Sequence, residues 1–463
     1  MGSCCFGFFF FKVNKRYAIS GQNYRMQSTS ELALNDSDVD ASLLKGGLKM
    51  KIGIISDTHF GDSTCKLLDN GKLSNIYTLL RNEIINFTRG SAKQPLDYLV
   101  LNGDTLDFSI NSFDDSCRKA RPFFAAIQQD NLAEKIILIP GNHDKQIWDV
   151  VEWERHVTMK MQQHNDPEEF TRTQPALIDF KNGLSLPGVS IKPGQNSPGG
   201  LFLEGFFPQG SNISIIVAYP NLYIKTPTDT YLVTHGHMLE PAWVLLSELM
   251  GDYPPIRQAT NNNIGLHELE ELNKPLTDLI CSAIGQGGPV SDIFYKIEVE
   301  AKKGKTDEMK KLFDCICPKL DTLIELPWYA EGLDNAFLFA LKKVALAIVE
   351  HGSSSRYDKE FYDKQSVRDR FTRFYKASCE QAQKMSLLSP PNQVIFGHTH
   401  EPIHGDSPKR VTVRELPHVD FNAIRNQELL LYNSGGWLQD VPGKSADIFF
   451  IDDNGNLTSV NIL

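Results

Sequence analysis

The sequence predicts an α/β fold: two mixed β-sheets pack face to face between flanking helices, with a large, mostly helical insertion. Three observations support this prediction. Over residues 52–139, short apolar runs typical of buried strands alternate with segments of helical spacing, which predicts a βαβαβ unit with parallel strands. Over residues 174–234, runs rich in Gly, Pro and β-branched residues predict a second, mostly antiparallel sheet. Residues 238–392 have a largely helical pattern.

The first 49 residues lack the pattern of a folded domain. Gly2 with Cys4 and Cys5 resembles a site for two acyl chains, although the position that favours Ser or Thr holds Phe. Alternatively, translation starts at Met50, and we favour this second interpretation. Residues 17–48 are rich in Ser, Asn and Asp, so we expect them to be disordered in either case.

The location that we expect is the cytoplasm. The eight cysteines are irregularly spaced, which fits reduced thiols in that compartment. Association with a membrane through a lipidated N-terminus is the alternative, and it is the one membrane contact that the sequence suggests.

After the leader, which covers residues 1–49, we divide the chain into three parts. Residues 50–237 form the first part of the domain, residues 238–392 the insertion, and residues 393–463 the last part of the domain. In the first part, periodic apolar residues predict three helices, at Leu67–Phe87, Phe123–Leu132 and Trp148–Gln163. In the last part, apolar runs predict strands at Glu428–Tyr432, near Ile448–Ile451 and at Leu457–Ile462.

Five predicted strands end in a small residue followed by polar side chains. The clearest is the apolar run Ile136–Ile139, which Pro140 and Gly141 stop, so the next residues lie on a loop at its carboxyl end. Ligands of open α/β sheets bind at this end of the strands. The polar side chains at the five strand ends are Asp57 and His59, Asp104 and Asp107, Asn142 and His143, His235 and His237, and His398 and His400.

This set of side chains predicts a metal centre. Any one of them could simply cap a strand or a helix, but the occurrence of all five motifs in one chain favours a shared site. Carboxylate and amide oxygens together with imidazole nitrogens suit Mn, Fe or Zn. The set is too large for one ion and suits two ions that share a bridging carboxylate. Two such ions about 3.5–4 Å apart act as a clamp for displacement at phosphorus.

The insertion leaves the domain just after His237 and returns just before His398, so we expect it to cover the site as a cap that sets substrate choice. Within it, Ala336–Val349 resembles a membrane span, but two central lysines favour a buried amphipathic helix. A further helix is predicted at Phe361–Leu387, with an apolar stripe formed by Val367, Phe371 and Phe374.

Three arginines lie beside that stripe: Arg368, Arg370 and Arg373. We favour a solvated helix face as their role, and binding of a substrate phosphate is the alternative. The net charge of −10 argues against general binding of nucleic acids, which requires a basic surface.

The order of the five motifs resembles that of the calcineurin-like metallophosphoesterase superfamily, over residues 51 to about 437. The resemblance implies that Asp104 bridges two ions, that His143 protonates the leaving group or stabilises charge on the phosphate, and that Asp107 orients His143. His237 is a predicted substrate contact because it lies next to these motifs. The ligands implied for one ion are Asp57, His59 and His400, and those for the other are Asn142, His235 and His398.

The function implied is hydrolysis of a phosphoester or pyrophosphate bond by a hydroxide that bridges the two ions. The turn Asn433-Ser-Gly-Gly-Trp437 resembles members related to nucleotide-sugar-lipid pyrophosphatases, although those members tend to carry Arg where this chain has His143. We therefore expect a small or lipid-linked phosphate substrate. A nuclease or phosphodiesterase of the same superfamily and a metal-free binding scaffold are the alternatives.

Overall fold

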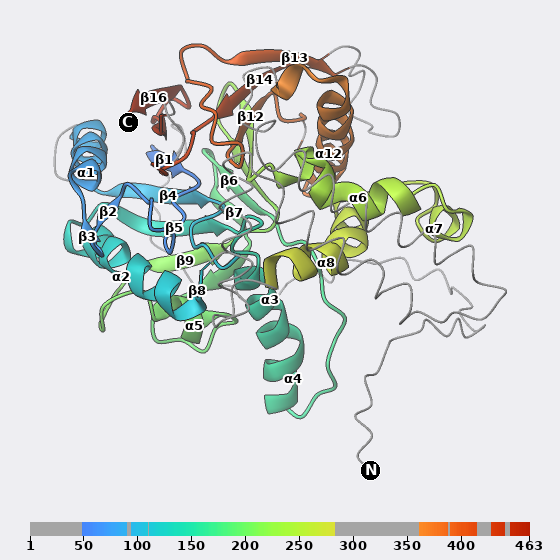
Figure 1. Ribbon diagram of the computed structural model, residues 1–463, viewed down its shortest axis with the longest axis horizontal. Coiled ribbons are helices and arrows are strands. Elements are labelled where there is room, and N and C mark those ends of the chain that lie inside the picture. The colour runs from blue at the N-terminus through green and yellow to red at the C-terminus, as the bar shows by residue number, and fades with distance from the viewer. Residues whose placement is uncertain are drawn as a thin grey trace, which may run out of the picture. The chain divides into compact units, whose positions relative to one another are not determined.

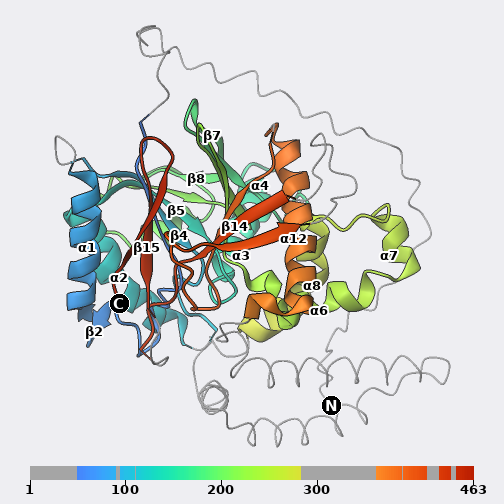
Figure 2. The ribbon, with the colours of Figure 1, turned by 90° about the horizontal axis from the view of Figure 1, so that it is seen from above.

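The computed structural model describes residues 49–89, 94–109, 111–282, 361–387, 389–413, 427–439 and 445–463. The expected leader, apart from its last residue, and the expected helix at Ala336–Val349 lie outside these residues. Within the described residues, two seven-stranded sheets lie between two layers of helices, as Figures 1 and 2 show. The predicted fold class is confirmed. No helix in the described segments has the length and apolar character needed to cross a membrane.

The first sheet has the order β16-β15-β1-β4-β5-β9-β8. Its central strands β1, β4, β5 and β9 are parallel, as predicted for the βαβαβ unit, and its edge strands are antiparallel. The strands are β1 (Ile52–Ile55), β4 (Leu96–Asn102), β5 (Ala133–Ile139), β8 (Val189–Ile191), β9 (Ser214–Val217), β15 (Asp447–Ile451) and β16 (Leu457–Asn461).

The second sheet has the order β13-β14-β12-β11-β10-β6-β7 and is mixed rather than mostly antiparallel. The apolar run at residues 213–219, expected in this sheet, instead forms β9 beside β5 in the first sheet. Both faces of β9 are buried, as is usual for a parallel strand inside a sheet. The strands of the second sheet are β6 (Ala176–Asp179), β7 (Gly183–Pro187), β10 (Asn221–Lys225), β11 (Thr230–Thr234), β12 (Gln393–Phe396), β13 (Lys409–Val413) and β14 (Gln427–Asn433).

Helices cover the outer face of each sheet (Figures 1 and 2). Those on the first sheet contribute to its outer hydrophobic core, and they are α1 (Asn75–Thr88), α2 (Phe113–Gln129), α3 (Gln146–Trp153) and α5 (Gly200–Glu204). Those on the second sheet belong to the insertion, and they are α6 (Pro241–Met250), α8 (Leu266–Ser282) and α12 (Gln365–Lys384). Shorter elements are β2 (Leu68–Asp69), β3 (Lys72–Leu73), η2 (Glu154–Thr158), α4 (Met159–Gln162), η3 (His237–Leu239), α7 (Pro254–Ala259) and η5 (Phe361–Asp363).

Two predicted helices have different limits in the structure. The segment expected as Leu67–Phe87 opens with the β2–β3 hairpin, because Asn70 and Gly71 both have positive φ angles that suit a tight hairpin turn. Helix α1 then begins after Ser74, whose hydroxyl accepts backbone N–H groups of the first turn. The helix expected at Phe123–Leu132 starts earlier, at Phe113.

In the insertion, the predicted apolar stripe of α12 is buried against the second sheet. Of the arginines beside it, Arg370 binds Glu248 at 2.9 Å and Arg368 binds Asp363 at 3.1 Å. Arg368 and Arg373 are exposed, as expected for a solvated helix face, whereas the side chain of Arg370 is only 13% exposed.

The space between the sheets is filled by alternate side chains of the central strands. In β5, Ile137 and Ile139 face the second sheet, whereas Ile136 and Leu138 face the helices, as the period of two in a strand requires. This shared core fixes the carboxyl ends of strands from both sheets relative to one another.

We expect Ile137→Ala to lower the free energy of unfolding by about 2–5 kcal/mol, because it leaves a cavity in the core between the sheets. Leu201→Ala is the control, since Leu201 is 91% exposed and its loss should change stability by less than about 0.5 kcal/mol. Urea denaturation of both variants measures the difference. Equal stability of the two variants would contradict the assignment of Ile137 to this core.

Candidate metal centre

Side chains from all five strand-end motifs come together where β1, β4 and β5 of the first sheet and β11 and β12 of the second sheet end. Among the described residues, three groups of buried side chains each bring three potential ligand atoms within 4.8 Å of one another, and the third of them is formed by His59, Asp107 and His143. The first group consists of Asp57, His59 and His400, and the second consists of Asp104, His235 and His398. Asn142 joins the second group, because its Oδ1 lies 3.0 Å from Nε2 of His235.

In the first group, imidazole nitrogens face one another and a carboxylate. Nε2 of His59 lies 3.1 Å from Nε2 of His400, which in turn lies 3.2 Å from Oδ1 of Asp57. Three lone-pair donors therefore converge on one point. Nitrogen and carboxylate oxygen donors in this arrangement fit a divalent ion of the Mn, Fe or Zn type.

Asp104 lies between the two groups. Its Oδ2 is 3.1 Å from Nε2 of His235 in the second group and 3.8 Å from Nε2 of His59 in the first. Its other oxygen accepts the backbone N–H of His143 at 2.8 Å. This position is the one that a carboxylate shared by two ions would occupy.

The charge states of Asp104 and of the histidines beside it depend on one another. Burial disfavours a charged carboxylate, but the neighbouring His235 and His143 hold the pKa of Asp104 well below its usual range. Burial also opposes the charged form of His235, yet Asp104 raises the pKa of His235 to about 9. The carboxylate of Asp104 therefore stays ionised at neutral pH, as binding of a cation requires.

The backbone at the predicted ligands adopts a conformation that is rare outside glycine. Five of these residues have φ angles between +47° and +66°, namely Asp57, His59, Asp104, His398 and His400. Each such residue costs of the order of 1–3 kcal/mol, and such residues cluster at functional sites. Backbone hydrogen bonds hold the first loop in place, with Asp57 N–H bound to the carbonyl of Gly103 and His59 N–H bound to the carbonyl of Asp104.

Two glycines allow the loops to pack this closely. A Cβ on Gly103 would collide with the imidazole of His235, and a Cβ on Gly397 would collide with the carboxylate of Asp57. A glycine at each of these positions therefore leaves room for a predicted ligand, His235 at Gly103 and Asp57 at Gly397.

His143 and Asp107 form a hydrogen-bonded chain with one predicted ligand. Oδ1 of Asp107 lies 3.0 Å from Nδ1 of His143, and Oδ2 lies 3.0 Å from Nδ1 of His59. The hydroxyl of Ser109 donates to Asp107 and contacts His143 as well. Although burial alone would raise the pKa of Asp107, His143 and His59 lower it. Asp107 therefore contacts the predicted ligand His59 as well as His143, and its contact with His59 was not predicted from the sequence.

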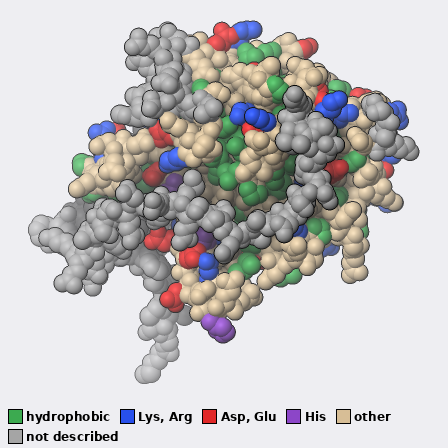
Figure 3. Space-filling model, turned by 180° about the vertical axis from the view of Figure 1, so that it is seen from behind, with side chains coloured by type: hydrophobic (Ala, Val, Ile, Leu, Met, Phe, Trp, Pro, Cys, Tyr) green, Lys and Arg blue, Asp and Glu red, His purple; other side chains and the backbone are tan. Residues whose placement is uncertain are grey.

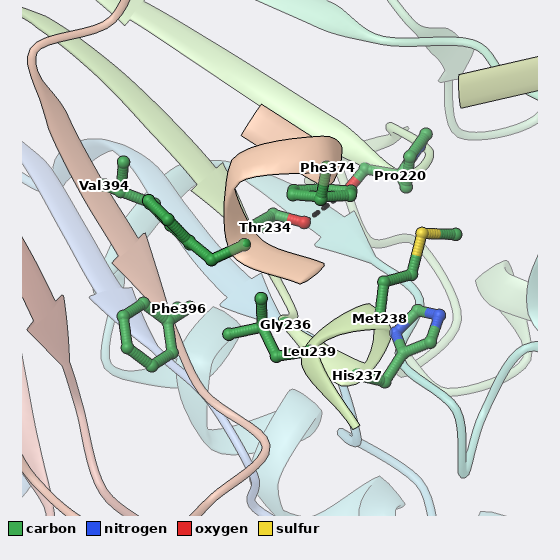
Figure 4. A pocket seen from close by; sticks show the side chains of 10 residues that line it. Pro220, Thr234, Gly236, His237, Met238, Leu239, Phe374, Val394 and Phe396 are labelled. Carbon is green, nitrogen blue, oxygen red and sulfur yellow. Dashed lines mark hydrogen bonds between the residues drawn. The ribbon is translucent and has the colours of Figure 1, made fainter. Parts of the chain in front are cut away.

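His237, the predicted substrate contact, lies buried beside His235 and His398, with ring centroids 5.7 and 6.4 Å away. Burial lowers the pKa of His237 well below its usual range, and the two neighbouring histidines act in the same direction. It lines an apolar cavity of about 10 Å³ together with Met238 and Phe374 (Figure 4). That volume is space for about one water molecule. Substrate binding by His237 stays a prediction.

Two further residues hold the loop that carries His398 and His400. The amide of Asn433 donates to the carbonyl of Gly397 at 2.8 Å and to the hydroxyl of Thr399 at 2.9 Å. The hydroxyl of Tyr362, in η5 of the insertion, lies 2.8 Å from that of Thr399. Asn433 was visible in the sequence as part of the closing turn, whereas no pattern marked Tyr362.

Asp144 ties two of the site loops together. Its carboxylate accepts the backbone N–H groups of Gly141, Thr105 and Leu106 at 2.7–3.2 Å. The loop after β5 is thereby attached to the loop after β4. The sequence placed Asp144 in its motif without a role, and this bracing is the role that the contacts give it.

We expect Gly103→Ala to reduce metal bound by the purified protein, because the new methyl group displaces the His235 ring. Gly71→Ala is a matched control: both glycines have positive φ, 84° and 74°, but a Cβ on Gly71 meets nothing within 4 Å. Both variants should lose roughly 1 kcal/mol or more of stability through the backbone. Metal analysis separates them, and equal metal content in the two would contradict this packing role of Gly103.

Comparison with known proteins gives one family. The model of the calcineurin-like phosphoesterase family matches residues 50–256, a range that ends inside the predicted insertion. A search of curated protein sequences gave no match.

Among solved structures, a cold-active protein-tyrosine phosphatase of a psychrophilic Shewanella species is 11% identical, with a TM-score of 0.27 over 92% of this chain and 85% of that chain. A point mutant of a cold-active protein tyrosine phosphatase is also 11% identical, with a TM-score of 0.27 over 92% and 85% of the two chains. Such low scores carry no argument about fold or function. The family match does carry weight: residues 50–256 match the calcineurin-like phosphoesterase family, in agreement with the resemblance of the motifs within that range.

Proposed function

We propose that this protein hydrolyses a phosphoester or pyrophosphate bond of a small or lipid-linked phosphate compound, with two divalent ions of Mn, Fe or Zn as cofactors. The observation that carries the proposal is the pair of buried donor groups that meet at Asp104. The family match supports the same chemistry, since calcineurin-like phosphoesterase domains are associated with metal-dependent hydrolysis of phosphoesters.

In this proposal the side chains divide into two ligand sets with one shared member. Asp57, His59 and His400 hold one ion, and Asn142, His235 and His398 hold the other. Asp104 contributes to both. Two bound ions supply a lowered pKa for water and offset negative charge on the phosphate oxygens.

His143 is the residue that we assign to the leaving group. Its Nδ1 is engaged by Asp107, so Nε2 is the ring atom that can donate a proton to the leaving oxygen. His143 is 8% exposed, and its ring lies edge-on to that of His59 at a centroid distance of 4.9 Å. The ring that would donate this proton therefore lies beside a predicted metal ligand.

The insertion, as a cap that selects the substrate, is part of the same proposal. One contact that supports it is the buried ion pair between Lys145, which directly follows the Gly141–Asp144 motif, and Glu270 of α8, with 3.2 Å between Nζ and Oε2. Tyr219 donates a further hydrogen bond to the same carboxylate oxygen at 2.7 Å. A helix of the insertion is thereby attached next to the motif that contributes Asn142 and His143.

A nuclease is the less favoured substrate class. On the described part of the face in Figure 3, Lys and Arg side chains lie among Asp and Glu side chains rather than in one basic stripe. Together with the net charge of −10, this distribution gives little attraction for a polyanion. A cytoplasmic location, with attachment of the N-terminus to a membrane as the alternative, remains part of the proposal.

The first test is a panel of phosphomonoesters, phosphodiesters and pyrophosphates, assayed with Mn²⁺, Zn²⁺ and Mg²⁺ after treatment with a chelator. We expect chelation to abolish hydrolysis and one of the transition-metal ions to restore it, because the donor sets combine oxygen with nitrogen. Pyrophosphatase activity would favour a nucleotide or lipid head group as substrate. Activity that survives complete metal removal would contradict the proposal, and strict diesterase activity would favour the nuclease alternative.

The second test concerns His143. We expect His143→Ala to keep its metal ions but to lose about 10²–10⁴-fold in kcat, the usual contribution of a general acid. Asp107→Asn should lower kcat less and also weaken metal binding, because Asp107 contacts His59. His267→Ala is the control, since His267 lies on the exposed surface of α8. Loss of metal from His143→Ala, with activity restored by added metal, would contradict the assigned role.

A further inference from the structure

The first residue after η3 places a carboxylate beside one of the predicted ligands. Oε2 of Glu240 lies 3.2 Å from Nε2 of His398, and both residues are buried, at 7% and 1% exposure. We propose that Glu240 is a positioning residue for the second metal position: it accepts the ring N–H of His398 and so links the insertion to the affinity for one of the two ions. This inference rests on the proposed function.

The local backbone places Glu240 there. Its N–H binds the carbonyl of His237 at 3.0 Å in the short helical turn that directly follows His235. Glu240 then caps the N-terminus of α6 with extended backbone, and Pro241 occupies the first helical position. The partial positive charge of a helix N-terminus favours a carboxylate at this point. The turn after one ligand, His235, thus carries the group that contacts another ligand, His398.

Glu240 acts through His398 rather than as a ligand itself. In the part of the chain that the structure describes, the group of converging ligand atoms consists of Asp104, His235 and His398, and Glu240 is not a member of it. A buried carboxylate is costly unless a donor or a positive charge lies beside it, and the ring of His398 is such a neighbour at 3.2 Å. With Nε2–H donated to Glu240, Nδ1 is the nitrogen of His398 that keeps a lone pair for an ion.

Two other predicted ligands also have an oxygen acceptor close to a ring nitrogen. Nδ1 of His59 lies 3.0 Å from Asp107, and Nδ1 of His235 lies 3.2 Å from the carbonyl of Asn102. Acceptors of this kind fix the tautomer and orientation of a ligand imidazole. Those for His59 and His235 come from the first sheet and the loop that follows β4, whereas the acceptor for His398 comes from the start of the insertion. Among the described residues, the insertion thus places an acceptor beside a predicted ligand of the second metal position.

The test is a metal titration of the full chain with Mn²⁺, read by binding stoichiometry and by the electron paramagnetic resonance signal of a coupled Mn²⁺ pair. Glu240→Met keeps the length of the side chain but removes the acceptor, and we expect it to weaken one of the two binding events about 10–100-fold. The other binding event should stay unchanged. At limiting Mn²⁺ the variant should give the spectrum of single ions where the wild type gives that of the pair.

Two further variants distinguish the proposed positioning of His398 from an effect of the Glu240 charge and from general destabilisation of the protein. Glu240→Gln keeps an oxygen that can accept the His398 N–H, so its loss should be smaller, within roughly threefold. Glu248→Gln is the matched control on α6, since Glu248 binds Arg370 rather than a predicted ligand. Its metal affinity should equal that of the wild type.

The outcomes distinguish this inference from the proposed function. A wild-type protein that binds fewer than two ions contradicts the two-metal centre and this inference with it. A wild type with two ions and an unchanged Glu240→Met overturns this inference alone. Equal weakening of both binding events in Glu240→Met, or a loss in Glu240→Gln as large as that in Glu240→Met, also overturns it.

Discussion

The arrangement of the site depends on one buried carboxylate that is shared between the two sheets. Asp104 lies at the start of the loop after β4. One of its oxygens lies close to a histidine from each sheet, and the other accepts a backbone N–H from the loop after β5. An ionised carboxylate in this position requires these donors or cations around it, because burial without them is costly. The apolar core between the two sheets fixes their positions relative to one another. Asp104 lies where this packing brings side chains from both sheets together.

A second constraint is the backbone at the strand ends. Positive φ angles at Asp57, His59 and His398 would be unfavourable in an isolated loop. They persist here because neighbouring loops bind the same segment on several sides, including the bond from His398 N–H to the carboxylate of Asp57 at 3.0 Å. Tertiary packing therefore stabilises the backbone conformation that orients the predicted ligands. The local sequence contributes mainly by placing glycine where a neighbouring loop approaches closely.

The difference between local sequence signals and tertiary packing explains what could be predicted from the sequence. The parallel unit and the polar side chains after each strand were predictable, because apolar runs that stop at a small residue are local signals. The sheet to which β9 belongs was predicted wrongly, because an apolar strand gives no sign of its neighbour when both of its faces are buried. The β2–β3 hairpin was missed although Asn70-Gly71 is a recognisable turn signal, because the helical spacing of the apolar residues around it was given more weight.

Contacts between distant residues mark the limit of prediction at the site. Asp107 was assigned to His143 from the motif resemblance, but its second bond, to His59, depends on the angle between two loops. Glu240 and Tyr362 carry no motif, and their roles follow from where the ends of the insertion pack. Contacts of this kind depend on how the two sheets pack against each other, and patterns in a single sequence do not encode that packing.

The same contacts bear on how the insertion and the domain relate to each other. Glu240 contacts His398, Tyr362 contacts Thr399, and Glu270 pairs with Lys145, so described parts of the insertion reach two loops of the site, those after β12 and β5. Separating the Lys145–Glu270 pair would leave a buried charge without its partner, which costs about 3–5 kcal/mol. Helices α6, α8 and α12 also cover the outer face of the second sheet, where their apolar side chains form a common core with it. These helices are therefore an integral layer of the fold.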